Sequence, residues 1–336
     1  MQELGKIFAD AGGAGAVCAL SLADGATVGH HADDPVVLAS VVKVPVALEA
    51  ERRFADGRLD PYRQVTLPAA DRSPGPVGFS LCRDDVTVSA RDLVPPMLTI
   101  SDNVATDALV GMLGVAAINA AFTEYGLRTT TMTGDERTVV DSIARDAGFA
   151  GWDELVRWMD TGPPMAEQEK VDAAVRRARE LDPATGTRST AREMVELLRL
   201  IWSDAFDPAA CARVRELMAR QLTRQRIAAG FDPPVRVAAK SGGLAGVVRN
   251  EIGVVSFPDG RDYAVAVFTR TERSGRERPM NAAIATAART AVEALRACGT
   301  DTVGGRGTGV DALRAPEAAR RGREAAGRAG GCGAGW

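Results

Sequence analysis

The sequence predicts an α+β fold: one antiparallel sheet formed by strands from both ends of the chain and flanked by helices, with an all-helical subdomain at about residues 58–225. Two observations carry this prediction. Short β-rich runs separated by turn signals lie near both ends, and the long stretch between them has the periodicity of amphipathic helices. Strands and helices segregated in this way are typical of an α+β domain.

The N-terminal elements follow from local patterns. Residues 2–11 have helical spacing, and the apolar run at 14–22 predicts a buried strand. The Asp24-Gly25 turn then leads into a second short strand, as in a hairpin. An apolar segment over residues 40–57 predicts the next helix.

The middle of the chain is predicted to be helical, and its last part returns to strands. Residues 60–80 form a loop rich in proline and glycine, Ser89 is an expected helix N-cap, and a further helix is expected after Ser101. The later elements are helices at 152–159, 171–181, 191–202 and 211–222, strands of an antiparallel meander at 235–240, 249–257 and 262–270, and a helix at 281–296.

The composition is that of an ordinary globular protein, with 336 residues, 46% hydrophobic and 25% charged. Lysine and arginine number 41 against 44 acids, so nothing predicts binding to nucleic acid or to an anionic membrane. The first residues show no secretory signal and no apolar run has the length of a membrane span, so we expect a cytoplasmic protein. The oligomeric state stays open.

Histidine and cysteine usage limits the possible chemistry. The two histidines, His30 and His31, are adjacent, which disfavours a Ser-His-Asp triad and a histidine-rich metal site. Five cysteines are scattered without CxxC spacing, as expected of reduced thiols. The chain also lacks a phosphate-binding loop and a GxGxxG turn. We therefore expect neither a metal nor an organic cofactor.

Three short motifs stand in a fixed order along the chain. Each is weak alone, but the first opens a predicted helix, the second precedes a helix, and the third ends a predicted strand before a glycine-rich turn. They are Ser40-Val41-Val42-Lys43, Ser101-Asp102-Asn103 and Lys240-Ser241-Gly242.

These motifs supply the parts of a serine nucleophile. A serine hydroxyl becomes reactive when a base takes its proton, and no histidine is well placed to do so. Ser40 and Lys43 lie three residues apart, so on a helix their side chains share a face. A lysine desolvated beside a second cation can have its pKa lowered enough to accept a proton, and Lys240 would be that cation. At a helix start, the Ser40 hydroxyl would also lie where the helix dipole favours negative charge.

The motifs and their order resemble those of the class A β-lactamase and penicillin-binding-protein superfamily of active-site serine hydrolases. The similarity covers about residues 1–298, and it implies a β-lactamase/transpeptidase-like fold. It also implies an acyl intermediate on Ser40. In that chemistry Ser101 would pass a proton to the leaving group, and Asp102 would brace its loop.

The resemblance also implies how a substrate would bind. The backbone N–H groups of Ser40 and Gly243 would form the oxyanion hole. Asn103 would hydrogen-bond a substrate amide and Ser241 a substrate carboxylate, so the expected partner is a small molecule with a carboxylate. Arg249 falls where many class A enzymes keep a carboxylate-binding arginine, although a surface strand arginine would look the same.

The sequence departs from the class A pattern around the residue that activates water for deacylation. Class A enzymes carry a glutamate in an ExxLN pattern that activates water, and Glu136 falls at about that distance from Ser101. The asparagine is absent, so Glu136 is either this base or a surface residue. An insertion at about 141–182 follows, which could cover the site, form a subunit interface or be decoration. A Gly-, Ala- and Arg-rich tail at 299–336 is expected to be disordered.

Three functions fit these features. The leading prediction is an intracellular serine hydrolase that forms an acyl-serine intermediate from a β-lactam, amide or ester with a nearby carboxylate. The second is an acyltransferase in a biosynthetic pathway, in which an amine or alcohol takes the acyl group from Ser40. The third is a non-catalytic module that binds a carboxylate without being acylated.

Overall fold

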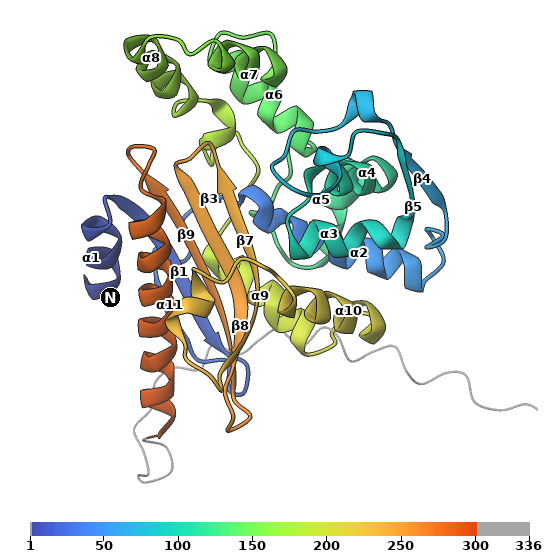
Figure 1. Cartoon of the computed structure of the whole chain (residues 1–336). Coiled ribbons are helices and arrows are strands. Elements are labelled where there is room, and N and C mark those ends of the chain that lie inside the picture. Colours follow the sequence, from blue (N-terminus) through green and yellow to red (C-terminus); the bar gives the residue numbers. More distant parts are fainter. Residues whose placement is uncertain (1, 301–336) are drawn as a thin grey trace, which may run out of the picture. The chain divides into compact units, whose positions relative to one another are not determined.

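The computed structural model describes residues 2–300, and its centre is a five-stranded antiparallel sheet in the order β2-β1-β9-β8-β7 (Figure 1). The residues up to Gly299 form one compact unit. Strands from the N-terminal part and from the C-terminal part of the described residues pair in this one sheet, which confirms the predicted α+β fold class. Its strands are β1 (Gly13–Ser21), β2 (Thr27–His30), β7 (Arg236–Leu244), β8 (Val248–Ser256) and β9 (Asp262–Thr271).

The C-terminal strands extend further than the sequence predicts. Pairing of β7 with β8 continues until Leu244 lies opposite Val248, so the Lys240-Ser241-Gly242 motif lies inside β7 and not at its end. The chain turns only afterwards, at Ala245 and Gly246, whose φ angles are 51° and 69°. The backbone of the third motif is therefore held by a strand ladder.

One face of the sheet is covered by α1 (Gln2–Asp10) and α11 (Glu277–Thr300). Alternate strand residues such as Val17 and Val265 are buried there with Phe8 and Ile284. This alternation is the period of two that a half-covered strand requires. The tail expected at 299–336 lies, beyond residue 300, outside the described residues.

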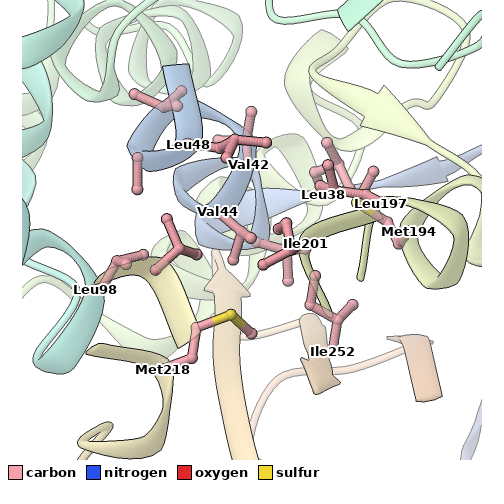
Figure 2. Close-up of a cluster of buried hydrophobic side chains, with 14 of the residues drawn as sticks. Leu38, Val42, Val44, Leu48, Leu98, Met194, Leu197, Ile201, Met218 and Ile252 are labelled. Atoms are coloured by element: carbon pink, nitrogen blue, oxygen red, sulfur yellow. The ribbon is translucent and has the colours of Figure 1, made fainter. Parts of the chain in front are cut away.

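The opposite face of the sheet packs on the helical part of the chain. Its main helices are α2 (Lys43–Ala55), α9 (Ala191–Trp202) and α10 (Pro208–Ala219). Figure 2 shows the buried cluster at this interface, which fixes the start of α2 against the sheet; it includes Leu38, Val42, Val44, Leu48, Leu98, Met194, Leu197, Ile201, Met218 and Ile252.

The helical part also contains short strands. The loop expected at 60–80 holds β4 (Gln64–Leu67), which pairs with β5 (Val86–Ser89). Ser89 therefore ends a strand; a 3₁₀ turn, Ala90–Leu93, follows and leads into α3 (Val94–Thr99). The alternating valines and threonines of these two runs favour strands over a helix start.

Two helices follow the second motif, and a second short ladder lies beside the first motif. The helices are α4 (Asn103–Leu113) and α5 (Val115–Glu124). The ladder pairs β3 (Val36–Val37) with β6 (Arg188–Ser189). Among the described residues, no single helix has the length and apolar character of a membrane span, and the one pair of helices that together does, α4 with α5, is bent by 82°.

Three helices form the region of the insertion, which lies above the upper end of the sheet in Figure 1. They are α6 (Glu136–Asp146), α7 (Trp152–Asp160) and α8 (Met165–Val175). The helix expected at 171–181 thus begins earlier and ends at Val175, with a separate 3₁₀ turn at Arg179–Leu181. The chain before α6 carries no signal for it except Asp135, whose side chain caps the helix by accepting from Thr138 N.

Candidate active site

Ser40 lies on a 3₁₀ turn, Ala39–Val42, directly before α2. The backbone N–H of Lys43 donates to the carbonyl of Ser40, which closes this turn. Because a 3₁₀ helix has three residues per turn, side chains three apart eclipse one another. The serine and the lysine of the first motif therefore share a face, although the turn that joins them is 3₁₀ and not α-helical.

Lys43 is fully buried and is surrounded by oxygen atoms. Its Nζ donates to the Ser101 carbonyl at 2.9 Å, to Ser101 Oγ at 3.3 Å and to Asn103 Oδ1 at 2.7 Å. Glu136 Oε1 lies 3.2 Å from the same nitrogen. The amino group of Lys43 is therefore within reach of a hydroxyl, an amide and a carboxylate at once.

The second motif lies at the junction of α3 and α4. Ser101 has a φ of 64°, in the left-handed region, where a non-glycine residue is strained by about 1 kcal/mol. The bond from Lys43 to the Ser101 carbonyl holds this conformation. Asp102 is buried, caps α4 by accepting from Ala105 N, and accepts from Phe79 N at 2.7 Å. These bonds give Asp102 a bracing position.

Asn103 is held at both ends of its amide. Its Oδ1 accepts from Lys43, and its Nδ2 donates to the carbonyl of Pro74 at 2.8 Å. The loop that contains Pro74 forms part of the wall of the cleft beside Ser40. Asn103 therefore links the buried lysine to that wall.

Glu136 lies at the first position of α6, with its side chain 17% exposed. Its backbone N–H donates to Asp107 Oδ1 at 2.7 Å, and the next N–H, of Arg137, donates to Asp107 Oδ2 at 3.0 Å. Asp107 also accepts from Ser73 Oγ. The start of α6 is thus fixed to α4, and this placement brings Glu136 to Lys43 and not to the protein surface.

The third motif brings β7 against the Ser40 turn. At Gly242 a Cβ would lie 3.0 Å from the Leu38 carbonyl and 3.2 Å from Val41 N, so a side chain there would have to displace backbone. Lys240 is fully buried and donates to the Ser241 carbonyl at 2.7 Å. Burial, together with the nearby charge of Lys43, holds the pKa of Lys240 well below its usual value.

A cleft of about 590 Å³ is lined by residues from all three motifs. The residues that line it include Ser40, Ser101, Asn103, Glu136, Ser241 and Gly243. Lys43 and Lys240 are fully buried and do not line it. Gly243 lies on β7, where its backbone is available to the cleft. The structure therefore brings together the residues of the predicted site, Arg249 excepted.

A model of the beta-lactamase enzyme family matches residues 1–295 of the chain. The chain belongs to this β-lactamase family. It is 29% identical over 289 residues to the beta-lactamase regulatory protein BlaB of Streptomyces cacaoi, a match that covers 81% of this chain and 89% of that protein.

Solved structures share the fold of this family member. A variant of PBP-A in an acyl-enzyme complex with penicillin G matches with a TM-score of 0.69 and 19% identity, covering 88% of this chain and 96% of the other. An ancestral class A β-lactamase matches with a TM-score of 0.69 and 22% identity, covering 87% of this chain and 98% of the other. The fold is therefore β-lactamase/transpeptidase-like, as the motifs imply.

Arg249 does not reach the cleft of this family member. It lies opposite Gly243 in the β7–β8 ladder, and its guanidinium pairs with Glu277 Oε1, at the start of α11, at 3.1 Å. The arginine that lines the cleft is Arg226, which no motif indicates. Its Nη2 lies 4.0 Å from the place that a Cβ would occupy at Gly243.

Arg226 is buried in a polar layer beneath the third motif. Its Nη1 donates to the carbonyls of Gly242 and Asn250, at 2.7 and 2.5 Å. Burial lowers its pKa to about 10, against the opposing effect of Glu251. Glu251 in turn accepts from Gln221 Nε2 at 3.0 Å, and Gln221 Oε1 accepts from the backbone N–H of Ser241. This layer orients β7 from behind and supplies a cation at the cleft wall.

Asp107 predicts a pH dependence of stability. Burial, reinforced by the carboxylates of Glu136 and Asp135, raises the pKa of Asp107 to about 7. The folded state thus keeps a proton that the unfolded chain loses near the usual value of 3.8. The stability contributed by Asp107 is therefore fully present below that value and is lost as the pH rises through about 7.

The Asp107→Asn variant isolates this effect. An amide stays neutral, so the melting temperature of the variant relative to wild type is expected to rise between about pH 5 and about pH 8. Thermal unfolding of both proteins at the two pH values measures the difference. A difference in melting temperature that does not change with pH would contradict the prediction.

Proposed function

We propose that this β-lactamase family member is an active-site serine hydrolase that cleaves a lactam, amide or ester bond of a small carboxylate-bearing molecule through an acyl intermediate on Ser40. The observation that carries the proposal is the set of contacts of buried Lys43 with Ser101, Asn103 and Glu136. Burying an ion pair costs desolvation free energy. Such pairs beside a cleft are typical of functional sites, so the pair of Lys43 and Glu136 supports an active protein.

In the acylation step, Ser40 Oγ attacks the carbonyl carbon and its proton passes to Lys43 Nζ, which becomes an ammonium paired with Glu136 Oε1 at 3.2 Å. The carbonyl oxygen becomes an oxyanion and accepts from the backbone N–H groups of Ser40 and Gly243. The bond to the leaving nitrogen or oxygen then breaks, and that atom receives a proton from Ser101 Oγ, which Lys43 replenishes.

In the deacylation step, Glu136 takes a proton from a water molecule, and the resulting hydroxide attacks the acyl carbon. The bond between the acyl carbon and Ser40 Oγ then breaks, and Oγ receives the proton that Glu136 took from water, so both side chains return to their starting state. Arg226 and Ser241 would bind the substrate carboxylate on the β7 wall of the cleft, a role that the proposal assigns to Arg226 in place of Arg249. The Nη2 group of Arg226 would make this contact, because Nη1 donates to the carbonyls of Gly242 and Asn250 and Nε donates to Asn281 Oδ1 at 3.0 Å.

Intact-mass measurement over time, with benzylpenicillin and with a fluorophosphonate, tests the proposal. Wild type is expected to gain the mass of the probe and, with benzylpenicillin, to return to its original mass as product forms. Ser40→Ala is the matched control and should gain nothing. If wild type gains no mass with either probe, or if Ser40→Ala reacts equally, the proposal is wrong.

A second candidate is a protein whose acyl-Ser40 is not hydrolysed: either a penicillin-responsive regulator that keeps the acyl group, or an acyltransferase that passes it to an amine or alcohol. Val140 lines the cleft four residues after Glu136, where the class A pattern has asparagine, so a valine takes the place of an amide that could hold water. The similarity to a protein named as a β-lactamase regulatory protein supports this candidate as well.

Val140→Asn separates the two candidates. If the missing amide limits deacylation, the variant is expected to release the acyl group about tenfold or more faster than wild type, since a positioned hydrogen bond in the transition state contributes on that scale. Single-turnover decay of the acyl-enzyme, followed by mass, measures the rate. If the acyl-enzymes of wild type and of Val140→Asn decay equally fast, the hydrolase is favoured. Product analysis with added amines reveals a transferase.

A further inference from the structure

Two walls of the cleft differ in chemistry. One wall contains the polar side chains of Ser241 and Arg226, the backbone of Gly242 and Gly243, and the residues Leu244 and Ala245 that follow them. Another wall is mostly apolar, and it combines a loop before the second motif, the residue that follows α3, and residues from α6 and α7. Its apolar residues are Pro74, Pro76, Val77, Ile100, Val140 and Trp152.

Trp152 brings the insertion into this wall, and several contacts fix its position. Its backbone N–H donates to Asp141 Oδ1 at 2.8 Å. A Cβ on Gly151 would lie only 3.0 Å from the same oxygen, so glycine permits this close approach. Arg137 donates to Asp141 at 3.2 Å and to Asp153 at 2.7 Å, which joins α6 to the first turn of α7.

Apolar contacts within the insertion also hold α7. Leu155 is buried, and the rings of Phe149 and Trp158 pack with their centroids 5.4 Å apart. The start of α7 therefore has both polar and apolar anchors, and Trp152 is presented to the cleft by an ordered helix. A site built on an ordered element can discriminate between substituents.

We propose that Trp152 and the apolar wall form a subsite for a bulky, aromatic-sized apolar substituent on the acyl side of the substrate. The inference rests on the proposed function, because it takes the acyl carbon to be at Ser40 and the carboxylate to be on the β7 wall. The remaining substituent is then directed to the wall that Trp152 completes. An apolar ring gains free energy by leaving water there, whereas a small or charged group gains none.

A matched pair of ligands tests the subsite. Benzylpenicillin and 6-acetamidopenicillanic acid differ only in a phenyl ring, and their equilibrium binding is measured calorimetrically with Ser40→Ala protein, which needs no acylation. The ring is expected to tighten binding about tenfold or more, the scale for a small apolar group in a fitted pocket. Trp152→Ala in the same background is expected to remove most of that preference and to leave binding of the acetamido compound within about twofold.

Met165→Ala is the control, since this exposed residue lies at the start of α8 in the same insertion. It is expected to keep the preference for the ring. Equal affinity of Ser40→Ala protein for the two ligands, or an equal loss of preference in the Trp152→Ala and Met165→Ala variants, overturns the inference. Acylation of wild type is measured separately by intact mass. If the protein is not acylated but prefers the ring, the proposed function is wrong and the subsite stands. If the protein is acylated but shows no preference for the ring, the subsite is wrong and the proposed function stands.

Discussion

Lys43→Met is expected to lower the rate of Ser40 acylation by about a thousandfold or more, within the range for general acid–base catalysis. The change removes the only cation that contacts Glu136 in the described ion pairs, and it leaves Ser101 Oγ and Asn103 Oδ1 without their donor. Pre-steady-state acylation by benzylpenicillin, followed by intact mass, measures the effect.

Two further variants separate chemistry from folding. Lys43→Arg keeps a positive charge but cannot lose a proton in a protein, so it is expected to stay folded and still acylate poorly. Lys6→Met removes an exposed lysine that pairs with Asp10, and it should acylate as wild type does. Acylation at the wild-type rate by both Lys43 variants would exclude the proposed role of this residue.

Glu136→Gln is expected to slow deacylation by about a hundredfold or more while the first-turnover acylation falls much less. Glutamine preserves the shape of the side chain and an oxygen for Lys43, but it cannot accept a proton from water. The acyl-enzyme should therefore accumulate and be visible as a stable mass increase after benzylpenicillin is added.

Glu167→Gln, an exposed acid in the first turn of α8, is the matched control and should leave the decay of the acyl-enzyme unchanged. A Glu136→Gln protein that deacylates at the wild-type rate would remove this residue from the hydrolytic step. A variant that fails to acylate at all would show instead that Glu136 is needed to activate Ser40.

The elements with strong local patterns were the predictable ones. The first helix, the first hairpin and the C-terminal meander repeat apolar residues at the periods of helix and strand, and the structure places them within a few residues of the prediction. The Ser89 region shows where such signals mislead. Ser89 Oγ does donate to Asp92, as in a cap, but it does so at the end of β5.

The site could be predicted where a short motif carries it and not where tertiary contacts do. The three motifs indicate Ser40, Lys43 and Lys240 directly. Glu136 reaches Lys43 only because Asp107 fixes the start of α6, a contact between residues far apart in the sequence. Arg226 and Trp152 enter the cleft from a loop and from the insertion, and neither belongs to a recognisable pattern.

The pairing of β1 with β9 also bears on how the protein is made. β1 ends at Ser21, but its partner strand begins only at Asp262, so the first hairpin of a growing chain waits for most of the synthesis before its second edge is covered. Such distant pairing is typical of slow folding. Ser40 and Lys240 are brought together by the same late event, so the cleft beside Ser40 stays incomplete until β7 has been made. Until β9 is added, the edge of β1 that faces it has no partner strand, and such an open apolar edge is prone to aggregation.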